Sequence, residues 1–143
     1  MNWTSITSGD VNAAGSPEII AAAEAKSPGA TVEAIADAVA EVRQAVSAGN
    51  ALDVDVTRVP NSLKRLTARR AFFALVDVLQ ADLGTDQRET KKNDQSRLNR
   101  LIDEKLRVEA PDNSAGHGEM QTQPSPSINP RQRNFTDRTT DGI

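Results

Sequence analysis

The sequence predicts a small all-α protein, a bundle of about four helices with one short extended segment and a long irregular C-terminal arm. In the first 110 residues, apolar side chains recur at helical spacing, and capping residues, glycine or proline stand at the ends of these stretches. After residue 110, prolines and small polar residues replace the apolar pattern. We therefore expect a helical domain over residues 1–110 and an arm over residues 111–143.

Two helices are predicted before residue 50. The first starts at the run Ser-Pro-Glu of residues 16–18, in which serine caps, proline tolerates the first helical position and glutamate complements the helix dipole. It ends at about Lys26, before a Ser-Pro-Gly break, and Thr31 caps the second helix. Five residues of the second helix recur at spacings of 3, 4, 3 and 4 and should face apolar partners: Val32, Ile35, Val39, Val42 and Val46.

The apolar period then changes from helical to alternating. Leu52, Val54 and Val56 alternate with polar residues, as they would on a half-exposed strand. A single strand needs a partner, which is either another segment of this chain or the same segment of a neighbouring copy. These three residues are therefore candidate contacts between subunits.

Two further helices follow. The third is predicted over residues 63–83, with Gly84 at its end. Its first half is basic, and its second half is almost entirely apolar, which places it at the centre of the bundle. The fourth is predicted from Asp86 or Thr90 to Arg107, and only its C-terminal turns carry an apolar stripe, made of Leu98, Leu101, Ile102 and Leu106.

Charge is distributed unevenly along the chain, whose formal net charge is −3. Residues 1–57 carry 2 basic and 8 acidic side chains, whereas residues 58–107 carry 12 basic and 7 acidic ones. These opposite charges either pair within one domain, which we favour, or lead copies of the chain to pack head to tail. Arg65 and Arg69, from the basic half of the third helix, are therefore candidate interface residues.

No catalytic motif is found, and we expect no enzyme activity, no cofactor and no bound metal. The chain has no cysteine, which excludes disulfides, thiolate nucleophiles and thiolate metal ligands. The only histidine, His117, lies between two glycines, where nothing positions a base. Asp53 and Asp55 resemble the paired carboxylates that hold Mg²⁺, but further oxygen ligands are lacking, so solvent-facing carboxylates are the favoured interpretation. No apolar run is long enough to span a membrane.

The basic residues are also compatible with a nucleic-acid-binding surface. A basic helix after a turn is how many small DNA-binding proteins present their recognition element, so a helical DNA-binding or regulatory protein is an alternative. The overall balance is acidic, however, and no aromatic residues interleave with the basic ones. Weak contact with DNA, without sequence preference, fits this composition better than sequence-specific binding.

Five short segments follow one another in a characteristic order. They are Asn-Trp-Thr-Ser-Ile-Thr at residues 2–7, Gly-Asp-Val at 9–11, Val-Ala-Glu-Val-Arg at 39–43, Val-Pro at 59–60 before Leu63, and Val-Glu-Ala-Pro at 108–111. Their order and spacing over residues 2–111 resemble those of small neck proteins of tailed bacteriophages and prophages, the head-to-tail connector, adaptor or head-completion proteins. The chain from Asp112 onward has no counterpart in this family.

This resemblance implies a structural virion protein, made in the host cytoplasm and located in the neck between head and tail. It implies a helical subunit of a homo-oligomeric ring, commonly of twelve copies, beneath the portal protein, with DNA passing through the lumen. The other expected partner is a stopper or tail-completion protein, and the chain could itself be one of these. No membrane is involved. In the arm, Ile128 and Phe135 are candidate anchors on the portal or on a neighbouring copy.

Overall fold

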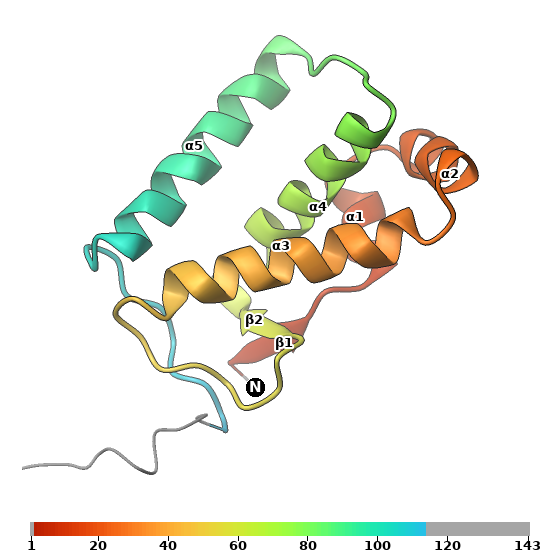
Figure 1. Cartoon of the computed structure of the whole chain (residues 1–143). Helices are drawn as coiled ribbons and strands as arrows, with labels where there is room; N and C mark the ends of the chain where they lie inside the picture. The colour runs from red at the N-terminus through yellow and green to blue at the C-terminus, as the bar shows by residue number, and fades with distance from the viewer. Residues whose placement is uncertain (1, 114–143) are drawn as a thin grey trace, which may run out of the picture.

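The computed structural model describes residues 2–113, and within them the predicted all-α class is confirmed. A two-stranded sheet lies at one end of a group of helices (Figure 1). No helix in this part of the chain is long and apolar enough to cross a membrane. In chain order the elements are β1 (Trp3–Ser5), α1 (Ser8–Ala14), α2 (Pro17–Lys26), α3 (Ala30–Val46), β2 (Arg58–Pro60), the 3-10 turn η1 (Asn61–Leu63), α4 (Lys64–Val78) and α5 (Thr85–Ile102).

The helix α4 is the centre of the fold, as its apolar sequence predicts. It contacts each of the other four helices of the described chain. Figure 1 shows α3 crossing in front of it and α1 lying behind it. The core is largely aliphatic, and its buried aromatic side chains are Phe72 and Phe73 of α4 and Trp3 of β1. On α5 the buried apolar residues are Leu98 and Leu101, in its C-terminal turns as predicted, whereas Ile102 of the predicted stripe is 53% exposed.

The apolar stripe of α3 is buried over most of its length, but its first residue is not. Val39, Val42 and Val46 lie in the core and Ile35 packs against it, whereas Val32 is 73% exposed. Val32 lines an open groove among α1, α2 and α3. The expectation that the whole stripe faces apolar partners is therefore wrong for Val32, because the first turn of α3 buries Ala30, Thr31 and Ala34 instead.

The helix α1 is not among the helices predicted from the sequence, although its start carries a recognisable signal. The side-chain oxygen of Thr7 accepts a hydrogen bond from the backbone N–H of Asp10 at 3.2 Å, and the Asp10 carboxylate accepts one from the N–H of Thr7 at 2.8 Å. This reciprocal capping box satisfies donors at the start of the helix. The apolar pattern that follows this capping box is too short to predict a helix by its spacing.

Two helices end earlier than predicted because a residue other than glycine adopts the left-handed conformation. Gln80 has φ 55° after α4, and the N–H of Ala81 donates to the carbonyl of Val76. Glu104 has φ 60° after α5, with an equivalent bond from Lys105 to Arg100. These are the bonds of a Schellman motif, which most often uses glycine. The predicted ends at Leu83 and Arg107 are therefore wrong.

The predicted strand over residues 52–56 is also wrong. The strand lies at Arg58–Pro60 and pairs antiparallel with β1, with Trp3 opposite Pro60 and Ser5 opposite Arg58. The partner thus comes from the same chain.

The junction of α1 and α2 gives a steric prediction. A Cβ atom at Gly15 would lie 2.2 Å from the buried ring of Phe72, so Gly15→Ala forces a core side chain to move. We expect a loss of about 1–3 kcal/mol in the free energy of unfolding, measured by urea denaturation. In a Phe72→Leu background the same substitution should cost less, and an equal cost in both backgrounds would contradict the proposed clash.

Candidate interaction surfaces

The loop after α3 is folded around the side chain of Arg43. Its guanidinium donates hydrogen bonds to the backbone carbonyls of Asp53 at 2.7 Å, Asp55 at 3.0 Å and Arg58 at 2.7 Å. On its other side the guanidinium lies 5.6 Å from the centroid of the buried Trp3 ring. Burial lowers the pKa of Arg43, and the carboxylates of Asp53 and Asp55 oppose that shift. Arginine remains charged in proteins, so a fixed cation organises this loop.

This cation explains why the alternating pattern of the loop is inverted. Asp53 is 0% exposed, and its Oδ1 accepts a hydrogen bond from the N–H of Asp55 at 2.8 Å. The expectation that Asp53 faces solvent is therefore wrong. The loop carbonyls turn inward to the guanidinium of Arg43. Within the described chain, no group of three or more His, Cys, Asp or Glu side chains is placed to hold a metal ion.

The same arrangement turns two valines outward. Val54 is 61% exposed and Val56 is 72% exposed, whereas Leu52 is half-buried and packs against the core. Two of the three candidate contact residues in this loop are therefore available to a partner, and the third is a packing residue. We call residues 51–57 the valine loop.

The chain after α5 is fastened across the domain, a feature that the sequence analysis missed. Residues 107–113, which we call the strap, make hydrogen bonds to four separate parts of the chain. The Nε1–H of Trp3 donates to the carbonyl of Glu109 at 2.8 Å, and the N–H of Val54 donates to the carbonyl of Asn113 at 2.7 Å. The remaining bonds join Arg107 to Gly49, Val108 to Asn50, Ser62 to Glu109, and Asn2 to both Ala110 and Asp112.

The strap contains the whole Val-Glu-Ala-Pro segment of residues 108–111, one of the five segments singled out in the sequence, and this segment was the available signal. Its last described contact places Asn113 beside Val54, so the described part of the chain ends at the valine loop. The candidate anchors Ile128 and Phe135, and His117, lie outside the described residues.

The carboxylate of Glu109 holds the strap to the start of η1. It accepts hydrogen bonds from the N–H of Ser62 at 2.9 Å and from its hydroxyl at 2.6 Å. Burial raises the pKa of Glu109, but the hydrogen bonds from Ser62 and the backbone outweigh it, so the pKa is lowered overall. A carboxyl with a lowered folded-state pKa stabilises the fold above its unfolded pKa and loses that contribution as the pH falls through its folded value.

Acid should therefore loosen the strap. Trp3 is the only tryptophan of a chain without tyrosine, and its indole bonds to the strap, so its fluorescence reports this contact. We expect a fluorescence transition below about pH 4.3, the unperturbed value for glutamate. Glu109→Gln should reduce this transition, and Glu89→Gln, at an exposed position on α5, should leave it unchanged. An unaltered transition in Glu109→Gln would assign it to another carboxyl.

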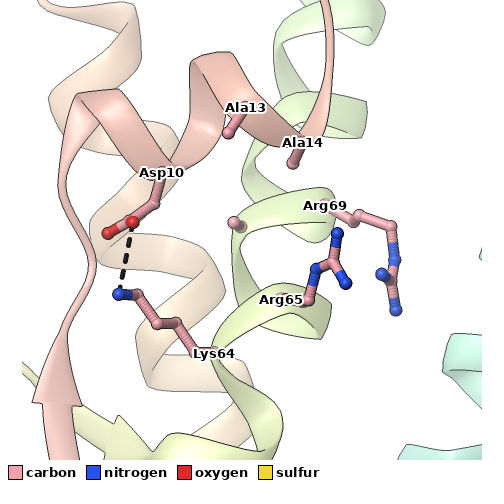
Figure 2. Close-up of a pocket in the computed structure, with 7 residues that line it drawn as sticks. Asp10, Ala13, Ala14, Lys64, Arg65 and Arg69 are labelled. Carbon is pink, nitrogen blue, oxygen red and sulfur yellow. Dashed lines mark ion pairs between the residues drawn. The ribbon is translucent and has the colours of Figure 1, made fainter.

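A second surface lies between α1 and α4, on the side of α4 where three basic side chains gather. It is a groove of about 310 Å³ with alanines along it and cations at its rim (Figure 2). Figure 2 shows Arg65 and Arg69 reaching out on the same side of α4, while Lys64 turns to Asp10. We call this the basic groove; its lining residues are Asp10, Ala13, Ala14, Lys64, Arg65, Ala68 and Arg69.

The two candidate arginines of this groove differ in their contacts. Arg69 makes two hydrogen bonds to the carboxylate of Asp94 on α5, at 2.7 and 2.8 Å, and the side chain of Asp94 is almost fully buried. The hydrogen bond to Asp94 raises the pKa of Arg69 against the opposing effect of burial. Arg65 is exposed and makes no ion pair with any described residue. Arg69 is thus committed to the fold, and Arg65 is available to a partner.

Part of the charge asymmetry is satisfied within the domain, as favoured from the sequence. Three of the four ion pairs in the described chain join the acidic first half to the basic second half: Lys64 with Asp10, Arg70 with Glu41 and Arg58 with Asp55.

Comparison with known proteins gives no further assignment. No protein-family model matches the chain, and no curated protein or solved structure matches it.

Proposed function

We propose that this chain is a structural subunit of the ring-shaped head-to-tail connector, or adaptor, in the neck of a tailed bacteriophage. One observation carries the proposal. The valine loop presents two exposed apolar side chains, and the N–H of its Val54 donates to the carbonyl of Asn113, the last described residue of the strap. An apolar contact site and the end of the strap therefore lie together, and residues 114–143 follow directly in the sequence.

The way the valine loop is built supports a contact surface. The bonds from Arg43 to three carbonyls fix its backbone before any partner binds. A contact surface that is ordered in advance loses less conformational entropy on binding. Many such contacts repeated around a ring would hold firmly, since each engaged subunit raises the effective concentration of the next.

A DNA-binding or regulatory protein is less well supported. Three basic side chains of α4 are engaged by carboxylates of the same chain, namely Lys64, Arg69 and Arg70. Much of α4 is also buried in the core, so this helix is not free to enter a DNA groove. A stopper or tail-completion protein of the same neck would differ from the adaptor only in the layer that it contacts.

The proposal is tested by replacing the exposed valines. The double variant Val54→Asp/Val56→Asp should fold with a free energy of unfolding within about 0.5 kcal/mol of wild type, since both residues are exposed. It should nevertheless fail to co-sediment with the portal ring of its own particle. Ile102→Asp, at another exposed apolar residue, is the matched control and should still co-sediment. Wild-type binding by the double variant would contradict the proposed role of the valine loop.

The C-terminal segment should matter for the same assembly. A chain that ends at Asn113 keeps every contact of the strap, unlike a chain cut at residue 111. We expect this shortened chain to be a folded helical monomer that binds the portal poorly. Circular dichroism and co-sedimentation measure the two properties, and unchanged incorporation into particles would rule out a docking role for residues 114–143.

A further inference from the structure

The outward face of α3 has a composition that matches the basic groove. Its exposed residues Glu33, Ala36, Asp37 and Ala40 recur at spacings of three and four, so they lie on one face of the helix. Neither carboxylate on this face makes an ion pair with a described residue. We call these four residues the acidic ridge.

The basic groove offers what the acidic ridge lacks. Arg65 stands at its rim without a carboxylate partner in the described chain, next to the guanidinium of Arg69. Arg65 and Arg69 together carry two positive charges, and only Arg69 is paired with a carboxylate, that of Asp94. The remaining positive charge favours an acidic partner in the groove. Alanines line the groove and alternate with the carboxylates on the ridge, and small side chains allow two helices to approach closely.

The ridge and the groove cannot meet within one chain. The opposite face of α3, with Ala38, Val42 and Val46, is buried in the core that α3 forms with α4, so the acidic ridge points away from α4. The groove lies where α1 meets α4, and none of the residues that line it belongs to α3. A contact between these two surfaces must therefore join different copies.

We infer that the acidic ridge of one copy seats in the basic groove of the next, with the carboxylates of Glu33 and Asp37 facing the guanidinium of Arg65. The contact joins unlike faces, so each copy gives one ridge and receives another, and repetition by rotation closes a ring. The inference rests on the proposed function, because the proposed ring is what requires such a repeating contact. It adds the surfaces through which neighbouring subunits meet.

Charge reversal on each side of the contact tests the inference. The full-length variants are Arg65→Glu, which reverses the groove, and Glu33→Lys/Asp37→Lys, which reverses the ridge. The readout is the mass of the complex formed on the portal ring in physiological salt. Each variant alone should assemble at least about tenfold more weakly than wild type, because like charges then face each other across the contact. All three positions are exposed, so the circular dichroism spectra should match that of wild type.

Mixing the two variants gives the sharper result. In an alternating ring, the reversed ridge meets the reversed groove, and the native ridge meets the native groove. An equimolar mixture should therefore assemble like wild type, although neither variant does so alone. Arg88→Glu, which reverses an exposed cation on α5, is the matched control and should assemble normally.

The outcomes distinguish this inference from the proposed function. Wild-type assembly by both reversed variants, or failure of their mixture to recover, would overturn the ridge-and-groove pairing and leave the ring in place. A wild-type chain that forms no multimer on the portal would overturn the ring, and the pairing with it. If Arg65→Glu assembles normally but loses affinity for duplex DNA, the groove is a phosphate-binding surface and the pairing is wrong.

Discussion

Arg43→Met should lower the free energy of unfolding by about 3–5 kcal/mol, the range for removing one partner from a buried charged network. Methionine keeps most of the apolar stem but cannot donate to the carbonyls of Asp53, Asp55 and Arg58. It also removes the positive charge that interacts with the buried carboxylate of Asp53, whose Oδ2 atom already lacks a hydrogen-bond partner in the described chain. The substitution should therefore open the valine loop as well as destabilise the domain.

Urea denaturation followed by Trp3 fluorescence measures this effect. Arg100→Met, at an exposed position on α5, is the matched control and should be nearly neutral. Asp53→Asn in the Arg43→Met background should recover part of the loss, because the buried negative charge is then absent. A loss of less than about 1 kcal/mol for Arg43→Met, the usual size of one net hydrogen bond, would contradict the role of Arg43 as the centre of the loop.

Arg69→Glu should lower the free energy of unfolding by about 3 kcal/mol, whereas Arg65→Glu should change it by less than about 0.5 kcal/mol. Arg69 holds the buried carboxylate of Asp94 through two hydrogen bonds, and a glutamate there would place two negative charges together. Arg65 is exposed on the same helix and has no such partner in the described chain.

Thermal and urea denaturation of the two variants, side by side, give the comparison. Asp94→Arg in the Arg69→Glu background should restore part of the stability by reversing the pair. Equal losses in the two single variants would show that the ion pair with Asp94 contributes little. The difference in stability between the two variants also shows which one to use in assembly experiments. Arg69→Glu would weaken assembly by unfolding the domain, so only Arg65→Glu reports on the contact itself.

The helical architecture could be predicted because it depends on local signals. The Ser-Pro-Glu start placed α2, the spacing of valines placed α3, and the apolar run placed α4 at the centre. The predicted cap at Thr31 is wrong, because α3 begins at Ala30 with Gly29 at its N-cap. The capping box at Thr7 would have located α1 as well. The ends of α4 and α5 could not be predicted, because Gln80 and Glu104 take a conformation that sequence rules assign to glycine.

The interaction surfaces depend on tertiary contacts that no local pattern contains. Alternation at residues 52–56 predicts a strand whose carboxylates face solvent, but the guanidinium of Arg43, from the preceding helix, binds the carbonyls of this loop, and Asp53 is buried. Arg65 and Arg69 look equivalent in the sequence, and only the position of Asp94 on α5 distinguishes them. The strap is a polar segment whose partners include Trp3 and Val54, far from it in the chain.

The central claim is that this domain is a subunit of a connector ring, and the most direct test is a mass measurement. The full-length protein is measured alone and after mixing with the portal protein of its own particle, in physiological salt. The account predicts conversion to a stoichiometric multimeric complex on the portal. A stable dimer that ignores the portal and binds a specific DNA duplex would contradict it and favour the regulatory alternative.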